Sequence, residues 1–278
     1  MLKNIPALFA AWLISTQALA ASPSVEDVAF ESHGVKLAGS IALPVGPVRA
    51  GVVFIHGSGP QSRDLDLAKH FAEEGIAALV YDKRGAGQSG GEYEARQSVS
   101  EKNINLLADD AAAALEALAD NPALKGVRVG FAGISQAGWI APLAAAKNAQ
   151  AQFLVLWSGP VCKVSEEDIF SKYTTDGDMD SVPTYATALA ARKDPYIWPD
   201  FLGRDTDSAE DLAKLKIRGL WLFGTRDGSI PVDLSIEKLR ALQTGGHRYD
   251  YVLFSGVGHN NLPDTFATAA DWIRKNVR

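Results

Sequence analysis

The chain has 278 residues, of which 47 % are hydrophobic and 22 % are charged, and its formal net charge is −6. This length can bury a large core in one α/β domain. The acidic balance, without any stripe of Lys and Arg, argues against a nucleic-acid partner. A single cysteine, Cys162, excludes an intrachain disulfide, so core packing alone must hold the fold.

The first twenty residues have the composition of an export signal. A short segment with one lysine, Lys3, precedes an apolar stretch that ends at Ala18-Leu19-Ala20. This order is typical of a signal peptide that is cleaved before Ala21. An uncleaved membrane anchor is the alternative, but the apolar run is shorter than the roughly 20 residues that a span needs. We therefore expect a signal peptide over 1–20 and a periplasmic or secreted domain over 21–278, without stable membrane insertion.

Apolar runs and helical patterns alternate along the rest of the chain. An opening pair of strands is expected over 28–34 and 35–44, with turn residues between them. Six uniformly apolar runs follow, at 50–57, 77–85, 127–135, 151–159, 219–227 and 249–259. Strands of this kind are typical of a sheet that is covered on both faces. The fold class predicted is α/β, a mainly parallel twisted sheet of about eight strands with helices on both faces.

Two helices can be placed by their periodicity. Between Ser98 and Asn121 the apolar residues recur at intervals of three and four, which predicts one buried stripe. Ser98 followed three residues later by Glu101 resembles a capping box, and Asn121-Pro122 ends the pattern. The last helix has the same spacing from Phe266 to Val277.

Residues 160–214 interrupt the alternation. They contain no strongly apolar strand, but many charges, several aromatic residues and four prolines. A solvated excursion is the simplest explanation, although so long a loop without structure of its own is unusual in a compact domain. We expect a small helical cap insertion over a site. The following aromatic residues either line an apolar acyl pocket or pack the cap onto the core: Phe170, Tyr173, Tyr185, Tyr196, Trp198 and Phe201.

Ser135 lies where a predicted strand turns directly into an alanine-rich helix. In an open parallel sheet, ligands bind at the carboxyl ends of the strands. A sharp turn there would strain the serine backbone and expose the hydroxyl, and it would tolerate only small neighbours. Gly133 and Ala137 supply them, although the usual pattern has glycine at the second position.

An acid and a histidine follow two later strands. Asp227 stands in "TRDGSIP" and His259 in "VGHNN", so the chain order is Ser, Asp, His. Serine needs a base to take its proton, and the base needs a group that orients it. A turn-forming aspartate and a hydrogen-bonded loop histidine are ordinary structural features, but three such residues at successive strand ends favour a catalytic triad. His56 competes for the role of base, although its position suits holding its own loop.

The same logic places donors for an oxyanion. One is the N–H of Gln136, directly after the serine, and the other comes from the loop "HGSGPQSRD" after an early strand. We expect Ser58 N–H to be this second donor, with Gly59 as the alternative.

Five motifs together resemble the α/β-hydrolase fold family, over nearly all of residues 21–278. They are "HGSGPQSRD", "YDKRGAGQSGG", "GISQAGWIAPLAA", "GTRDGSIP" and "GVGHN". Within the family they are most similar to single-domain bacterial carboxylesterases related to dienelactone-hydrolase and prolyl-oligopeptidase-type catalytic domains. The resemblance implies Ser135 as nucleophile, His259 as base and Asp227 as orienting acid.

The resemblance also implies that Asp82, Arg84 and Ser89 brace the loops beside the site. Two departures stand out, because Ala137 replaces a usual glycine and Pro142 interrupts the helix after the nucleophile.

The function expected is that of a serine hydrolase, a carboxylesterase that cleaves small to medium carboxylic esters through an acyl-enzyme. The substrate is a small-molecule ester, no cofactor or metal is required, and a monomer is the default. A thioesterase, a lactonase or a small peptidase would use the same triad. A non-catalytic binding protein of the same fold is the alternative from a different class.

Overall fold

The computed structural model describes residues 22–277 of the chain, so the predicted signal peptide lies outside the described residues. The strands are β1 (Ser24–Ser32), β2 (Val35–Leu43), β3 (Ala50–Ile55), β4 (Ile76–Tyr81), β5 (Val129–Ile134), β6 (Ala151–Trp157), β7 (Arg218–Gly224) and β8 (Tyr249–Phe254). The helices are α1 (Leu65–Glu73), α2 (Glu101–Ala119), α3 (Ala137–Lys147), α4 (Val164–Thr174), α5 (Tyr185–Ala190), α6 (Ser208–Leu212), α7 (Val232–Thr244) and α8 (Leu262–Asn276). Two 3₁₀ turns, η1 (Pro122–Leu124) and η2 (Asp200–Leu202), complete these elements.

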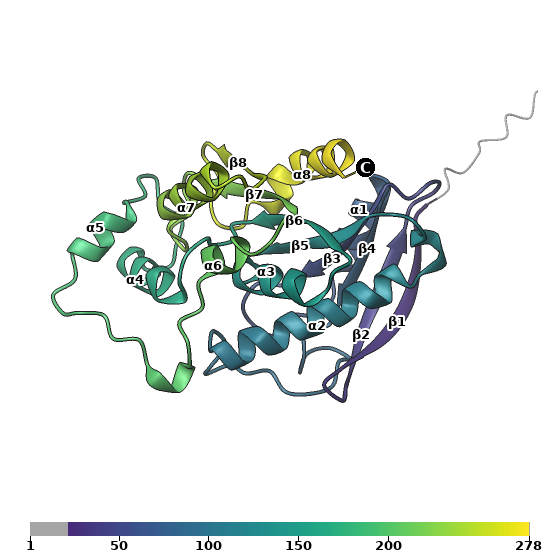
Figure 1. Ribbon diagram of the computed structural model, residues 1–278, viewed down its shortest axis with the longest axis horizontal. Helices are drawn as coiled ribbons and strands as arrows, with labels where there is room; N and C mark the ends of the chain where they lie inside the picture. Colours follow the sequence, from purple (N-terminus) through teal and green to yellow (C-terminus); the bar gives the residue numbers. More distant parts are fainter. Residues whose placement is uncertain (1–21, 278) are drawn as a thin grey trace, which may run out of the picture.

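The eight strands form one sheet in the order β1-β2-β4-β3-β5-β6-β7-β8 (Figure 1). The β1–β2 and β2–β4 pairs are antiparallel, and every other pair, from β4–β3 to β7–β8, is parallel. The predicted fold class, a mainly parallel sheet of about eight strands with helices, is therefore confirmed. The parallel arrangement brings the carboxyl ends of β3, β5, β6, β7 and β8 to one edge.

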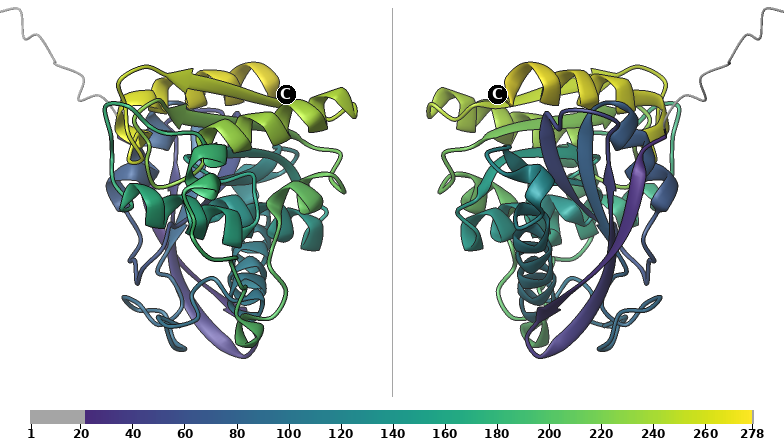
Figure 2. Two further views of the ribbon diagram at one scale, coloured as in Figure 1. Left: turned by 90° about the vertical axis from the view of Figure 1, so that its left-hand side faces the viewer. Right: turned by 90° about the vertical axis from the view of Figure 1, so that its right-hand side faces the viewer.

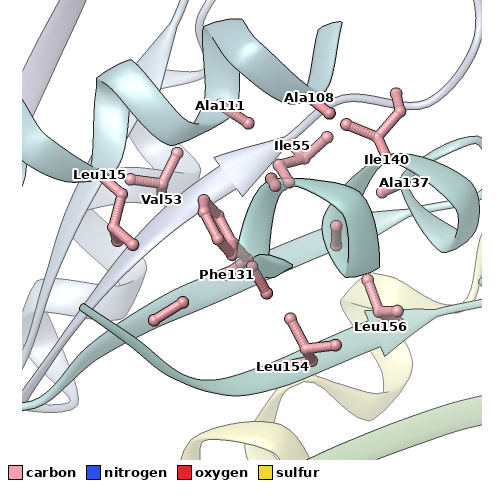
Figure 3. Packing of buried hydrophobic residues seen from close by; sticks show 14 of the residues in the cluster. Val53, Ile55, Ala108, Ala111, Leu115, Phe131, Ala137, Ile140, Leu154 and Leu156 are labelled. Carbon is pink, nitrogen blue, oxygen red and sulfur yellow. The ribbon is translucent and has the colours of Figure 1, made fainter. Parts of the chain in front are cut away.

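Helices cover both faces of the sheet because neighbouring residues of each buried strand point in opposite directions. In β3, Val53 and Ile55 belong to one core cluster and Val52 and Phe54 to the other. Helices α2 and α3 pack on the first cluster, where Figure 3 places Ala111 and Ile140 over the strands. Helices α1 and α8 cover the opposite face, and the end-on views of Figure 2 show the yellow α8 and the blue-green α2 on opposite sides.

Helix α2 begins two residues later than the capping-box pattern predicts, so that prediction is wrong. The N-cap is Ser100, whose extended backbone lets its Oγ accept from Asn103 N at 3.2 Å. The carbonyl of Ser98 instead accepts from the side-chain amides of Asn103 (2.8 Å) and Gln136 (2.9 Å). Ser98 thus tethers a residue of the site to the start of α2.

The segment 160–214 contains α4, α5, η2 and α6, and its ends meet in an isolated antiparallel bridge between Lys163 and Asp207. In Figure 1, α4 and α5 extend to the left of the sheet. Its role as a cap stays a prediction. Within residues 22–277, no helix has the length and apolar character that crossing a membrane requires.

Candidate active site

Ser135 occupies a strained turn between β5 and α3. Its φ is +57°, a left-handed conformation that non-glycine residues rarely adopt. The turn is held by bonds from Ser135 N to Trp157 O (3.0 Å) and from Gly138 N to Ser135 O (2.8 Å). A Cβ atom on Gly133 would lie 2.5 Å from the Cβ of Ala137 and 2.8 Å from the carbonyl oxygen of Ile55. Position 133 therefore requires glycine, and the methyl of Ala137 fills the space that this glycine leaves.

Asp227 and His259 come from the loops after β7 and β8 and form a direct pair. His259 Nδ1 lies 3.0 Å from each carboxylate oxygen of Asp227. Asp227 is fully buried, and its Oδ1 also accepts from Ser229 N (3.0 Å) and Ile230 N (3.3 Å). Because a carboxylate can only accept, the ring proton of neutral His259 lies on Nδ1, and Nε2 is free to accept a proton.

The surroundings of His259 increase its basicity. Burial alone would lower the pKa of the imidazole, but the hydrogen bond and charge of Asp227 act in the opposite direction. Asp176 adds further negative charge, so the pKa of His259 lies above its ordinary value.

Ser135 and His259 line one cavity of about 480 Å³. Its other walls come from Ser58, Val99, Trp139, Pro160, Glu167, Asp176, Gly177, Asp178, Ser229, Ile230 and Asn260. Among residues 22–277, no hydrogen bond joins Ser135 Oγ to His259. The two side chains thus share a cavity with the serine hydroxyl free, a spacing that is common before a substrate binds.

Two backbone N–H groups are available beside the serine. Ser58 lines the cavity, and Gln136 directly follows Ser135. In the described part of the chain, neither N–H donates to a protein acceptor. Gly59, the alternative donor, has φ +93° and does not line this cavity.

His56 lies outside the cavity that holds Ser135. Its Nε2 donates to the carbonyl of Tyr81 at 2.6 Å, and burial lowers its pKa. His56 lines a neighbouring cavity of about 360 Å³ with Phe54 and Asn260. It therefore holds the loop after β3, as its position in the sequence suggests.

One wall of the Ser135 cavity is acidic. Glu167, Asp176 and Asp178 all line it, and its lining contains no Lys or Arg. Asp178 Oδ1 accepts from His259 N at 2.8 Å. Burial, together with the charges of Asp168 and Asp176, raises the pKa of Glu167 to about 8. Sequence analysis missed these carboxylates, because no local pattern in 160–214 indicates which residues turn back towards the sheet.

The aromatic residues of 160–214 do not line this cavity. Phe170 is fully buried in the core, whereas Phe201 is 68 % exposed. Tyr196 donates a hydrogen bond to Asp168. The aromatic wall comes from Trp139 of α3, whose Nε1 donates to the carbonyl of Cys162 at 2.8 Å.

The chain that follows α4 is tied to both loops of the Asp–His pair. Thr174 Oγ1 donates to the carbonyl of Gly228, directly after Asp227. Met179 N donates to the carbonyl of Arg226 at 2.9 Å, and Asp178 holds the amide of His259. Residues 174–179 are thus part of the support of the pair.

The loop after β4 is braced by buried polar contacts. Arg84 forms a two-pronged ion pair with Asp110 of α2, with Nε 3.0 Å from Oδ2. Asp82 accepts from the amides of Arg63 (2.7 Å) and Gln88 (2.8 Å), and Ser89 Oγ donates to the Asp82 carbonyl at 2.6 Å. Within residues 22–277, no group of three or more His, Cys, Asp or Glu side chains is arranged to hold a metal ion.

Two family models match the chain. Residues 46–176 match the family described as serine aminopeptidase, S33, and residues 112–269 match BAAT / acyl-CoA thioester hydrolase C terminal. Polyketide transferase claH of Penicillium crustosum is 36 % identical over 103 residues, which are 37 % of this chain and 32 % of that protein. The chain thus spans about a third of the length of this curated relative.

Solved structures share the fold at low sequence identity. An esterase of Pyrococcus furiosus has a TM-score of 0.67 at 18 % identity, over 92 % of each chain. Pyrococcus horikoshii acylaminoacyl peptidase has a TM-score of 0.67 at 16 % identity, over 92 % of this chain and 42 % of that one. Dienelactone hydrolase from Anabaena variabilis has a TM-score of 0.60 at 19 % identity, over 93 % of this chain and all of that one. A family model that spans more than half of the chain shows that the protein belongs to the family described as BAAT / acyl-CoA thioester hydrolase C terminal, and it is therefore a hydrolase with the α/β-hydrolase fold.

Proposed function

We propose that the protein is a serine hydrolase that cleaves small to medium carboxylic esters, with Ser135 as nucleophile, His259 as base and Asp227 as orienting acid. One observation carries this proposal. A serine in a left-handed turn and a histidine paired with a buried aspartate line the same cavity of about 480 Å³. That volume suits a small-molecule ester.

The reaction proceeds in two acyl transfers. Ser135 Oγ attacks the ester carbonyl carbon while His259 Nε2 takes the hydroxyl proton. The tetrahedral intermediate collapses, the bond to the alcohol oxygen breaks, and the imidazolium gives its proton to the leaving alcohol. Water then attacks the acyl-enzyme with His259 again as base, which releases the acid and restores Ser135.

Asp227 and two backbone amides stabilise the charges that develop. Asp227 keeps the ring proton on Nδ1 and stabilises the imidazolium. The N–H groups of Gln136 and Ser58 donate to the oxyanion, and loss of one such donor typically costs about 3 kcal/mol of barrier.

A peptidase that acts on amine-bearing substrates is the second candidate, and the acidic wall favours it. The carboxylates of Asp176 and Asp178 would attract a protonated amine, and the serine aminopeptidase model agrees with this chemistry. The same wall disfavours the polyanionic thioesters that the second family model names. The same triad could also hydrolyse lactones and uncharged thioesters.

The deciding experiment compares p-nitrophenyl acyl esters of increasing chain length with amino-acid p-nitroanilides. Wild type is measured beside Ser135→Ala, with the exposed Ser181→Ala as a matched control. Ester turnover that disappears only in Ser135→Ala supports the esterase, and a preference for the anilides supports the peptidase. If wild type neither turns over a substrate nor reacts with a fluorophosphonate probe, the protein is a binding protein instead.

We propose in addition that the protein is exported and works as a monomer. Mass spectrometry of the protein from a bacterial periplasmic fraction should find a chain that begins at Ala21. Size-exclusion chromatography with light scattering should give the mass of one chain. A retained Met1, or a dimer mass, would contradict the respective proposal.

A further inference from the structure

We propose that Lys83 is a positioning residue whose single ammonium group holds both oxyanion donors, the N–H groups of Ser58 and Gln136. This inference rests on the proposed serine mechanism. Lys83 lies in the loop after β4, between Asp82 and Arg84.

The ammonium group is buried between the two loops that carry these donors. The Lys83 side chain is 3 % exposed, and its Nζ donates to the carbonyl of Gly57 at 2.7 Å and to Gln136 Oε1 at 2.8 Å. It also lies 5.7 Å from the centre of the Tyr93 ring. Two hydrogen-bond acceptors and one aromatic face thus surround the ammonium group.

The contact with Gly57 acts directly on the Ser58 amide. The carbonyl of Gly57 and the N–H of Ser58 belong to one planar peptide unit, in which a trans bond points them in opposite directions. The described residues contain no cis peptide bond. A hydrogen bond that fixes this carbonyl therefore fixes the direction of the Ser58 N–H, and it also polarises the peptide so that the N–H becomes a stronger donor.

The contact with Gln136 fixes the other donor. The Gln136 side chain is buried and held at both ends, with Oε1 on Lys83 and Nε2 donating to the carbonyl of Ser98 at 2.9 Å. Because Gln136 follows the nucleophile at the start of α3, holding its side chain holds its backbone N–H. Lys83 thus links the loop after β3 to the β5–α3 turn.

The charge of Lys83 is costly to the fold. Within residues 22–277, no carboxylate pairs with its ammonium group, and burial lowers the pKa of Lys83 to about 8. The neighbouring Arg84, by contrast, is neutralised by Asp110. A buried cation without a counter-ion is unfavourable for stability. The proposed role of Lys83 accounts for this buried positive charge, because negative charge develops on the oxyanion just beyond the two amides that Lys83 holds.

The test compares Lys83→Met with Gln136→Met and Asn148→Ala on a p-nitrophenyl ester that wild type hydrolyses and Ser135→Ala does not. Gln136→Met keeps the backbone N–H but removes the acceptor of Lys83. Asn148→Ala removes the buried hydrogen bond from Asn148 Nδ2 to the carbonyl of Ala112 (3.1 Å) at the far end of α3, and serves as the control for lost stability.

We expect kcat of Lys83→Met to fall about 30- to 100-fold with KM within about twofold, since only the oxyanion contacts weaken. Affinity for a boronic acid, which mimics the tetrahedral intermediate, should fall by a similar factor, whereas a neutral ketone should bind as before. Gln136→Met should show the same pattern to a smaller extent and should add little in the Lys83→Met background, because the two side chains act together. Asn148→Ala should lower Tm and leave kcat of the folded enzyme nearly unchanged.

Three kinds of result would overturn the inference. If kcat of Lys83→Met stays within about threefold of wild type while Ser135→Ala is inactive, Lys83 does not position the donors, although the proposed function stands. If Lys83→Met loses boronic acid and ketone affinity alike, or loses activity only in proportion to folded protein as Asn148→Ala does, its role is structural. Equal turnover by wild type and Ser135→Ala would instead remove the serine mechanism and the inference with it.

Discussion

The substitution Asp227→Asn should remove nearly all turnover while leaving the fold in place. The Oδ1 atom of Asp227 accepts from the amides of Ser229 and Ile230. Asparagine must therefore keep its single oxygen at this position, which directs its NH₂ group at His259 Nδ1. Two donors cannot face one another, so the ring proton moves to Nε2. Nε2 can then no longer accept the proton of Ser135.

The expected loss follows from this change of tautomer. In the serine protease triad, the corresponding substitution lowers kcat about 10⁴-fold, which is about 5.5 kcal/mol of barrier. The cost in stability is much smaller, about 1 to 2 kcal/mol, because the bonds from Ser229 and Ile230 are retained.

The assay is kcat for a p-nitrophenyl ester across the pH range, with thermal unfolding of the same samples. Asp233→Asn is the matched control, since Asp233 lies at the start of α7 and accepts from Tyr185 N (3.0 Å) rather than from His259. A loss of less than about tenfold in a folded Asp227→Asn protein would refute the argument from the tautomer.

Three further substitutions test the surroundings of the pair and the turn. Gly133→Ala should destabilise the fold by about 2 to 4 kcal/mol and disturb the Ser135 turn, because the new methyl would overlap Ala137; denaturant unfolding would measure this, and a wild-type midpoint would contradict it. Glu167 has a folded pKa of about 8, above its unfolded value, so the folded state holds the extra proton and stability falls as pH rises from about 4.5 to 8. Glu167→Gln should therefore gain about 1 to 3 kcal/mol over wild type at about pH 8.5 and little at about pH 4, as measured by urea unfolding; an equal difference at both pH values would be inconsistent with this linkage. Asp176→Asn removes a charge that raises the pKa of His259, so the acid limb of kcat/KM, which rises as the base loses its proton, should move to lower pH; an unmoved limb would count against this contribution.

The parts of the molecule that could be predicted from sequence are those with local causes. A strand that is buried on both faces has a uniformly apolar sequence, so the apolar runs predicted the strands, and every expected strand is present. The strain at Ser135 could be predicted because a sharp turn tolerates only small neighbours, and Gly133 and Ala137 are both small. The proximity of Asp227 and His259 could be predicted because the carboxyl ends of parallel strands meet at one edge of the sheet.

The features that could not be predicted depend on contacts between distant segments, or on a choice between two neighbouring residues that suit the same role. Asp178 lies 81 residues before the His259 amide that it binds, and nothing near it in the sequence indicates this contact. Lys83 stands beside residues whose role is bracing, and its partners come from two other loops. The start of α2 was misplaced because Ser98 and Ser100 both offer a capping hydroxyl, and only the backbone path selects Ser100.

The ties between residues 174–179 and the two loops of the Asp–His pair bear on how this enzyme could be re-engineered. An exchange of the whole segment 160–214 for that of a relative would also exchange Thr174, Asp178 and Met179, and so would release the loops that hold Asp227 and His259. An exchange that keeps these ties therefore has to begin after Met179. The part of the insertion that can be exchanged is shorter than the insertion itself, and chimeras that respect this boundary should keep the geometry of the pair.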